Sequence, residues 1–317
     1  MVTSGPLRIV FFGTPHFSVP TLEALLQSGH SVVSVVTQPD RPRDRGQRVS
    51  ESPIKTVAQA FQIPVLQPDK LRDEGFLQAL SATAADLGVV AAYGKILTEA
   101  VLGTPRLGLI NVHASLLPRY RGAAPVHRAV INGDSETGVT IMRMVKALDA
   151  GPMLATVRRP IGPDETSEDI ERDLAQLGAS LLVSTVGDVA EGRIVEQPQD
   201  DSLATYAPRL TKDEGVIDWA LSAQKLHNLI RGLHPWPHAV TYHRNRRLIL
   251  HRSAVLTDVN GEPGAVLESQ GDHLHVATGS GALAITEIQP EGRRAMPTRD
   301  FLAGHRVAVG DQLTTHP

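Results

Sequence analysis

The chain has 317 residues, 41% hydrophobic and 21% charged, with a formal net charge of −3, a balance typical of a soluble globular protein long enough for two domains. The absence of cysteine excludes disulfides, thiolate nucleophiles and zinc sites with cysteine ligands. No run of about 18 apolar residues is present, so no membrane-spanning helix is expected, and the slight negative charge excludes nucleic-acid binding through bulk basicity.

Apolar runs alternate with amphipathic segments along the first third of the chain. The runs at 7–12 and 31–36 have the continuous apolar character of buried parallel strands. Between them, Ser18 is placed to cap a helix that has Pro20 in its first turn. Further strands and helices are expected at 63–66, 86–93, 109–112, 53–61 and 71–80. This alternation predicts a doubly wound, Rossmann-like parallel sheet of the α/β class.

A long connection follows the second expected strand and runs from Thr37 to Lys55. Its prolines and its glycine are incompatible with a regular helix. It contains four closely spaced arginines: Arg41, Arg43, Arg45 and Arg48. A solvated loop has the same composition, but long connections in compact domains are more often functional. The segment is therefore a candidate contact for a polyanion.

The fifth expected strand ends in polar side chains. Asn111 and His113 alternate along it and so point to the same side. Ligands of parallel sheets bind beyond the carboxyl ends of the strands, where an amide and an imidazole can hold a carbonyl oxygen and exchange a proton. An ordinary hydrogen-bonded strand end has the same pattern. A turn at 115–118 and a basic run with Arg119 and Arg121 follow.

Three further segments and a long helix complete the first domain. A helix and a hairpin of two strands are expected at 122–132, 138–145 and 153–161. The pattern TSED at 166–169 is a capping box that opens a helix reaching about Ala190. Asp149 lies in the hairpin turn, 36 residues after His113, where an aspartate is either catalytic or an ordinary turn residue.

The sequence changes character near Tyr206, and we place the boundary between two domains there, at 1–205 and 206–317. A helix and several short strands with glycine-rich turns are expected at 222–231, 248–251, 265–267, 274–277 and 283–288. Short, evenly spaced strands predict a small OB-like β-barrel. The second domain has 12 Lys and Arg against 11 Asp and Glu, with one basic cluster at Arg244, Arg246 and Arg247.

Two pairs of histidines in the C-terminal domain resemble pairs of metal ligands. His273 and His275 lie on one face of an expected strand, with no carboxylate cluster nearby in the sequence. His234 and His238 belong to the segment HPWPH. We expect both pairs to be structural or surface groups, and no metal.

Five motifs, in this order, resemble the 10-formyltetrahydrofolate-dependent formyltransferase family. They are GTPHFSVP, TQPDRPRDRGQ, AAYGKILT, NVHASLLPRYRGAAP and ETGVTIMRMVKALDAGPML. The later segments DEGVIDW and NLIRGLHPWPHA are similar to the linker and C-terminal domain of some members. The TQPDRP loop and this C-terminal module are typical of the members that act on initiator methionyl-tRNA, and the resemblance covers nearly the whole chain.

The resemblance implies transfer of a formyl group from 10-formyltetrahydrofolate to the α-amino group of methionine on the initiator tRNA, for translation initiation. The family's catalytic residues fall on Asn111, His113 and Asp149. Asn111 and protonated His113 would donate hydrogen bonds to the oxyanion of a tetrahedral intermediate. Asp149 would orient His113 or relay the proton of the amine through water. The reaction requires no metal.

The family's folate contacts fall on one turn, and the end of the fourth expected strand would line the same pocket: Ser115, Leu116, Leu117, Pro118, Tyr93 and Gly94. We expect the tRNA to contact the arginines of the long connection, of the basic run and of the C-terminal cluster. These are Arg41, Arg43, Arg45, Arg48, Arg119, Arg121, Arg244, Arg246 and Arg247.

The sequence departs from the family in two places. Pro152 stands where the family often has a second aspartate, and Arg43-Asp44 stands where the loop usually has Ala-Gly. One alternative is a related formyl enzyme that acts on another amine or hydrolyses the formyl group, and the arginine-rich loop and C-terminal domain argue against it. Another is a non-catalytic nucleotide- or RNA-binding protein, and the three catalytic residues argue against that.

The start and the composition of the chain lead to expectations for its cellular location and oligomeric state. The segment before Leu7 is too short for a signal peptide, so we expect a cytoplasmic protein without a membrane anchor. We expect it to act as a monomer, with initiator methionyl-tRNA and the folate as its partners.

Overall fold

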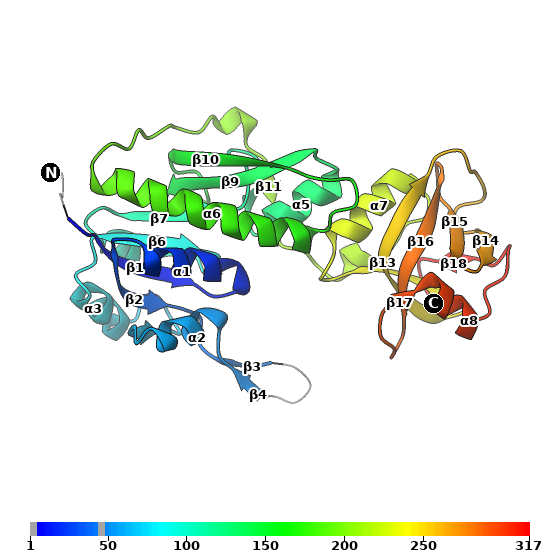
Figure 1. Cartoon of the computed structure of the whole chain (residues 1–317), viewed down its shortest axis with the longest axis horizontal. Coiled ribbons are helices and arrows are strands. Elements are labelled where there is room, and N and C mark those ends of the chain that lie inside the picture. The colour runs from blue at the N-terminus through cyan, green and yellow to red at the C-terminus, as the bar shows by residue number, and fades with distance from the viewer. Residues whose placement is uncertain (1–4, 44–47) are drawn as a thin grey trace. The chain divides into compact units, whose positions relative to one another are not determined.

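The computed structural model describes residues 5–43 and 48–317, and of residues 41–43 and 48–49 it describes the backbone alone. The chain forms two compact units, which Figure 1 colours from the N-terminus to the C-terminus. The first consists of Met1–Gly122, Thr137–Arg159 and Glu171–Tyr206, and the second of Ala123–Glu136, Pro160–Ile170 and Ala207–Pro317. The second unit therefore includes two segments that precede residue 206.

The first unit is built on a seven-stranded sheet with the order β10-β9-β7-β6-β1-β2-β5. Its strands, in chain order, are β1 (Arg8–Gly13), β2 (Ser31–Val36), β5 (Val65–Leu66), β6 (Leu87–Ala91), β7 (Leu109–His113), β9 (Glu136–Arg143) and β10 (Met153–Pro160). The five strands from β7 to β5 are parallel, as predicted. The sheet is mixed rather than purely parallel, because β9 runs antiparallel to β7.

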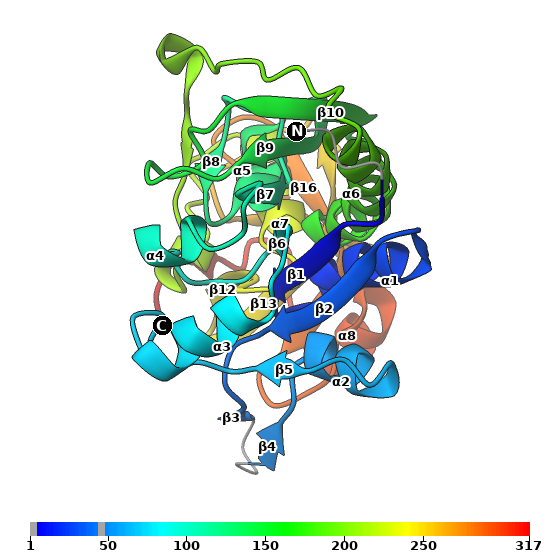
Figure 2. The same cartoon turned by 90° about the vertical axis from the view of Figure 1, so that its left-hand side faces the viewer.

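Helices cover both faces of this sheet, as expected for a doubly wound fold. They are η1 (His16–Ser18), α1 (Val19–Gln27), α2 (Pro53–Ala60), α3 (Glu74–Ala82), α4 (Glu99–Leu102) and α6 (Ser167–Ala190). Figure 2 shows α1 and α6 on one side of the strands and α3 and α4 on the other. On the α3 side, Phe76 and Leu80 join a buried cluster with Phe12, and on the opposite side α6 packs its Gly178 against Val112.

The start of α1 differs from the prediction. Ser18 occupies the N-cap position, but its hydroxyl donates to the carbonyl of Ala91 in β6 (2.6 Å) and makes no capping bond. A Cβ atom at Gly13 would lie 2.9 Å from Cβ of Ser18, so the chain needs glycine where β1 ends. The capping box of α6 is confirmed, because Thr166 and Asp169 exchange backbone-to-side-chain hydrogen bonds.

The second unit has a seven-stranded sheet in which all the pairings between adjacent strands are antiparallel. Its strands are β12 (Ala239–His243), β13 (Arg246–Leu256), β14 (Val266–Gln270), β15 (His273–Ala277), β16 (Ala282–Pro290), β17 (Met296–Pro297) and β18 (Leu313–Thr314). Backbone bonds from Val266 to Asp311 and from Leu313 to Gly264 join segments beside the two outer strands. The sheet therefore curls into a half-barrel, consistent with the predicted barrel class.

Three helices accompany this half-barrel: α5 (Pro125–Asn132), α7 (Ala223–Gly232) and α8 (Thr298–Gly304). Leu226 and Ile230 of α7 pack with Leu250 of β13 in its buried core. The remaining short elements are β3 (Arg41–Arg43), β4 (Arg48–Ser50), β8 (Arg121–Gly122), β11 (Tyr206–Ala207), η2 (Asp201–Leu203) and η3 (Asp213–Gly215). Across the described ranges, every helix is too short or too polar to cross a bilayer.

Candidate active site at the carboxyl edge of the sheet

The strand register aligns the carboxyl ends of the parallel strands along one edge. Phe12 of β1 lies beside Val36 of β2 and Val90 of β6, and Val90 lies beside Asn111 of β7. The segments that follow these four strands therefore all leave the sheet at this edge. Asn111 and His113 are buried here, and Thr140 of β9 is the register partner of His113.

The ring of His113 is oriented by a main-chain carbonyl. Its Nε2 lies 2.9 Å from the carbonyl oxygen of Tyr120, and because a carbonyl only accepts, Nε2 carries the hydrogen. Tyr120 has a left-handed backbone (φ 61°), and its N–H donates to Oγ1 of Thr205 (2.9 Å). The Tyr120 backbone thus leaves Nδ1 as the nitrogen of His113 that can gain or lose a proton.

Asp149 approaches that free nitrogen. Its Oδ2 lies 3.8 Å from Nδ1 of His113, and the same oxygen accepts a hydrogen bond from the N–H of Gly122 (2.8 Å). The distance from Asp149 to His113 is too long for a direct hydrogen bond but suits an ion pair when the imidazole is protonated. The structure therefore brings together an amide, an imidazole and a carboxylate from β7 and from the β9–β10 turn.

The turn that carries Asp149 is held in an uncommon backbone conformation. Asp149 has φ 47°, a left-handed value that costs free energy unless its surroundings impose it. A Cβ atom at Gly151 would lie 1.9 Å from the carbonyl oxygen of Arg143, so only glycine fits there. The side-chain amide of Gln199 donates to the carbonyls of both Asp149 and Gly151 (2.8 Å each). Gln199 was not indicated by the sequence.

Arg121 supports the same turn. Its guanidinium is 4% exposed and donates to Oε1 of Gln199 (2.8 Å) and to Oδ1 of Asp201 (2.7 Å). A buried guanidinium engaged in this way is not available to a phosphate, so we leave Arg121 out of the tRNA surface proposed below. By contrast, Arg119 is exposed, with its Cζ 5.0 Å from the ring centroid of Tyr120.

The turn Ser115–Pro118 is fixed by Thr140. The hydroxyl of Thr140 donates to the carbonyl of Ser115 (2.7 Å) and accepts from the N–H of Leu117 (3.2 Å). Leu117 is buried and Leu116 is half-buried, and a Cβ atom at Gly138 would lie 2.5 Å from Leu116. Of the two leucines, Leu116 therefore has the more accessible side chain.

Tyr93 and Gly94 lie just after the C-terminal end of β6. The ring of Tyr93 is buried and meets that of Phe12 edge-on, with centroids 5.6 Å apart. Burial raises the pKa of Tyr93 to about 12, and among the described residues its hydroxyl has no hydrogen-bond partner. Its carbonyl accepts from the side chains of Thr14 (3.1 Å) and Gln38 (3.0 Å). Gly94 is exposed and has a left-handed backbone (φ 84°).

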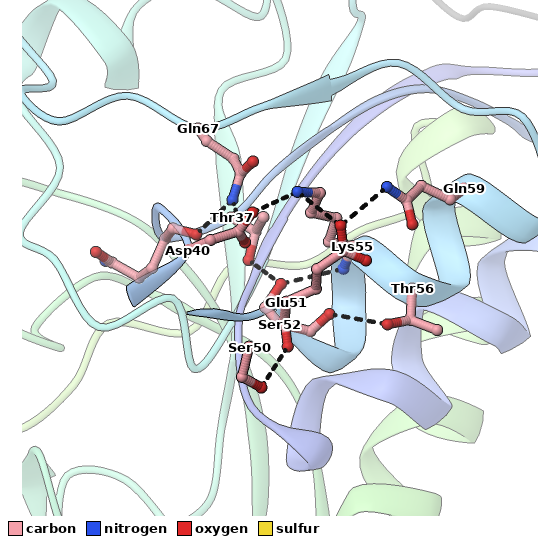
Figure 3. Close-up of polar contacts among 10 residues, drawn as sticks. Thr37, Asp40, Ser50, Glu51, Ser52, Lys55, Thr56, Gln59 and Gln67 are labelled. Atoms are coloured by element: carbon pink, nitrogen blue, oxygen red, sulfur yellow. Dashed lines mark hydrogen bonds and ion pairs between the residues drawn. The ribbon is translucent and has the colours of Figure 1, made fainter. Parts of the chain in front are cut away.

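The long connection after β2 contains a short antiparallel hairpin, β3–β4, instead of a simple loop. Figure 3 shows a polar network at its base. Asp40 accepts hydrogen bonds from Lys55 and from Gln67 (2.8 Å), which together hold its pKa below the ordinary value. Lys55 also pairs with Glu51 (3.0 Å). Arg45 lies outside the described residues, and only the backbones of Arg41, Arg43 and Arg48 are described.

The basic cluster of the second unit lies on the β12–β13 hairpin. Arg244 and Asn245 form its two-residue turn, with φ of 50° and 64°. Arg244 pairs with Asp311 (3.1 Å). Arg246 and Arg247 are exposed and have no ion-pair partner in the part of the chain that the structure describes.

A mostly parallel sheet with an amide, an imidazole and a carboxylate at its carboxyl edge defines an acyl-transfer type of site. The family model of formyl transferases matches residues 7–186, and that of the formyl transferase C-terminal domain matches residues 209–306. The chain belongs to the methionyl-tRNA formyltransferase family, as its similarity to curated members establishes.

Two relatives and one solved structure illustrate this similarity. The chain is 46% identical over 307 residues to the methionyl-tRNA formyltransferase of Geobacter sulfurreducens, covering 97% of this chain and 96% of that one. It is 48% identical over 305 residues to that of Pelobacter propionicus, covering 96% and 95%. An N-formyltransferase from Helicobacter canadensis, in complex with folinic acid and dTDP-3-aminofucose, shares the fold, with a TM-score of 0.67 and 17% identity over 88% of this chain and 99% of that chain.

Proposed function

We infer that the protein transfers the formyl group of 10-formyltetrahydrofolate to the α-amino group of methionine on initiator tRNA, giving N-formylmethionyl-tRNA for translation initiation. Membership of the family supports this activity. The observation that carries it is the approach of Asp149 to Nδ1 of His113 beside Asn111. Asp149 is 36 residues from His113 in the sequence, and the fold brings the two side chains together at this edge.

The chemistry assigns a role to each group. The amine nitrogen attacks the formyl carbon, whose oxygen becomes an oxyanion. The bond from the formyl carbon to N10 of the folate then breaks, N10 gains a proton and the amine loses one. Asn111 donates to the oxyanion from its amide, and protonated His113 donates from Nδ1, because Nε2 is occupied by Tyr120. Donors of this kind are typically worth ~3 kcal/mol each.

Asp149 stabilises the protonated form of His113 and accepts the amine's proton through water. The N–H of Gly122 already occupies one position on its carboxylate, which fixes the direction in which Oδ2 faces. The gap of 3.8 Å to His113 leaves the proton path to be completed by the substrate amine or by water.

We propose that the folate lies against the turn of Ser115, Leu116, Leu117 and Pro118 and the strand end of Tyr93 and Gly94. Half-buried Leu116 supplies apolar contact for the pterin and its linker. Leu117 is buried and packs the turn against the protein interior. The exposed main chain at Gly94 suits hydrogen bonding to a heterocycle. Both segments adjoin Asn111 and His113, so the formyl group would reach the two donors.

We propose that the tRNA contacts arginines of each unit. In the first unit these are Arg41, Arg43, Arg45 and Arg48 of the long connection, with Arg119 beside the catalytic strand. Three strand spacings separate the ends of β2 and β7, which is about 14 Å, so a nucleotide or two of the acceptor end would bridge them. In the second unit, Arg246 and Arg247 would hold backbone phosphates.

We further propose that residues 1–205 carry the formyl transfer and residues 206–317 bind tRNA, and that the protein works as a monomer in the cytoplasm. Sedimentation of the protein alone and with tRNA tests the monomer, since a second copy would double the mass.

The test of the activity is formyl transfer to charged initiator tRNA by purified variants. We expect Asn111→Ala, His113→Ala and Asp149→Ala each to lower kcat by about 10²- to 10³-fold, the usual loss for one preorganised group, with little change in tRNA affinity. Thr140→Ser, which keeps the hydroxyl beside His113, is the matched control for the strand end. A His113→Ala enzyme with wild-type turnover would rule out this mechanism.

A further inference from the structure

Three histidines of the second unit converge in space. His234 and His238 belong to the segment after α7, and His251 belongs to β13. The ring centroids lie 5.4 Å (His234–His238), 5.9 Å (His234–His251) and 4.6 Å (His238–His251) apart. One nitrogen of each ring lies within 4.8 Å of a nitrogen of the other two. We call these residues the histidine cluster.

The Nε2 atoms of two of these rings are held by oxygen acceptors. Nε2 of His234 lies 3.2 Å from Oε2 of Glu168, and Nε2 of His251 lies 2.9 Å from Oε1 of Gln289. The amide of Gln289 is itself oriented, because its nitrogen donates to the carbonyl of Arg293 (2.8 Å). Both acceptors require a hydrogen on Nε2, so the neutral rings of His234 and His251 have a lone pair on Nδ1.

The remaining nitrogen of His234 has the properties of an unused ligand. Nδ1 of His234 is buried and has no hydrogen-bond partner among the described residues, a situation that ordinarily destabilises the folded state. A neutral imidazole nitrogen with a free lone pair is the form that binds metals.

We propose that the histidine cluster binds one divalent transition-metal ion such as Zn²⁺ through three imidazole nitrogens, with water at the fourth position. Three neutral nitrogen ligands without thiolate suit zinc and its neighbours rather than magnesium or calcium. The contacts of Glu168 and Gln289 match those of such sites, in which each ligating imidazole donates its other N–H to an oxygen. Bond lengths of about 2.0–2.1 Å place tetrahedral ligand nitrogens about 3.4 Å apart, so the three nitrogens, now within 4.8 Å of one another, would draw together around the ion.

The ion would fasten the HPWPH segment to β13. That segment supplies two ligands four residues apart, and the third comes from a strand that pairs with β12, so sequence spacing alone does not show the site. A bound ion would cross-link these elements and stabilise the second unit in proportion to its affinity and concentration.

The test uses the full-length chain without a polyhistidine tag, stripped with EDTA and titrated with zinc chloride in a calorimeter. We expect one zinc per chain and a higher melting temperature with zinc. His238→Ala and His251→Ala should abolish stoichiometric binding, and Glu168→Gln should weaken it about 10-fold, as loss of a carboxylate that orients a ligating imidazole does. Circular dichroism of the zinc-free variants checks that they are folded.

The matched control is His273→Ala/His275→Ala. These residues lie with Glu268 in a second, more exposed group on β14 and β15, and the control variant should keep the calorimetric site. Zinc binding that persists in folded His251→Ala, or that disappears in the control variant, would overturn the proposal.

A measurement on the wild-type protein does not depend on the folding of a variant. Trp236, half-exposed, lies between two of the ligands in the sequence, whereas the other tryptophan, Trp219, is buried. Cobalt(II) should quench the fluorescence of Trp236 at a 1:1 ratio, zinc should reverse the quenching, and Trp236→Phe should remove it. Absence of saturable zinc and cobalt binding by the wild-type protein would also refute the site.

Discussion

At the scale of single residues, the orientation of the His113 ring and the surroundings of its second nitrogen are set by two groups that are distant from one another in the sequence. The carbonyl of Tyr120 occupies Nε2, and Asp149 faces Nδ1 across 3.8 Å. Asp149 in turn depends on the amide of Gln199, which joins the carbonyls of Asp149 and Gly151. The position of the carboxylate therefore rests on a side chain that does not itself reach the reacting atoms.

Replacement of Gln199 tests this positioning role. We expect Gln199→Ala to lower kcat about 10- to 100-fold, because a misplacement of about 1 Å has such an effect, while KM for charged tRNA changes little. Gln199→Glu is the informative comparison. It keeps an acceptor for Arg121 but cannot donate to the two carbonyls, and should be nearly as slow as Gln199→Ala. Steady-state kinetics measure kcat for each variant. A Gln199→Glu enzyme with wild-type kcat would show that the turn carrying Asp149 keeps its conformation without the hydrogen bonds from Gln199.

The sequence predicted part of this arrangement. The alternation of Asn111 and His113 at the end of an apolar run placed both at the carboxyl edge, because a strand has a period of two. The approach of Asp149 was available only through family resemblance, since spacing along the chain does not determine distance in space. Tyr120 acts through its carbonyl, which no residue pattern reveals, and buried Arg121 could not be distinguished from an exposed arginine.

At the scale of elements, long apolar runs were easier to predict than short or polar segments. The expected strand at 31–36 matches β2, and the capping box located the start of α6. The four-residue α4 was missed because it has too few residues for a helical period, and β12 was missed because it lies between turns rich in proline and arginine. The direction of β9 was not predictable from its pattern, which fits either orientation.

The β12–β13 hairpin depends on one carboxylate. Asp311 accepts hydrogen bonds from the N–H of Ala308 (2.9 Å), from His243 (2.9 Å) and from Arg244 (3.1 Å). These contacts, the Ala308 bond foremost, lower the pKa of Asp311 to about 2. A carboxylate whose pKa is lowered on folding stabilises the native state above its unfolded pKa and loses that effect as the pH falls through the folded pKa.

We therefore expect the second unit to lose about 1 kcal/mol of stability between about pH 4 and pH 2 through Asp311, a figure reduced by solvent screening. Both tryptophans lie in this unit, so urea unfolding followed by their fluorescence measures it selectively. Asp311→Asn should be less stable than the wild type at pH 6, and the difference should shrink toward pH 2. A constant difference across this range would assign the effect to packing instead of charge.

At the scale of the whole molecule, the tRNA must be bound by local charge. The chain has 31 Lys and Arg against 34 Asp and Glu, so its overall field does not attract a polyanion. The sequence identified arginine clusters in both parts of the chain, but it could not tell which of them are neutralised. Arg121 is bonded to Gln199 and Asp201, and Arg244 forms an ion pair with Asp311. The sequence does not show these pairs, because the fold brings the partners close from distant positions in the chain.

This distinction within one hairpin gives a matched test of tRNA binding. Each phosphate neutralised by an arginine releases counterions, so the logarithm of affinity falls linearly with the logarithm of salt concentration. We expect Arg246→Ala/Arg247→Ala to weaken binding of charged initiator tRNA and to reduce the magnitude of this slope by about 1.5, for two phosphates at about 0.7–0.9 each. Arg244→Ala removes a charge that Asp311 already balances, and should leave the slope nearly unchanged. In the first unit, Arg41→Ala/Arg45→Ala should also reduce the magnitude of the slope, as Arg246→Ala/Arg247→Ala does. This variant should raise KM for the tRNA, with KM for the formyl donor unchanged. Filter binding at several salt concentrations supplies the slopes. Equal effects of Arg244→Ala and Arg246→Ala/Arg247→Ala would mean that tRNA displaces Asp311, and the pairing seen in the free protein would not predict its contacts.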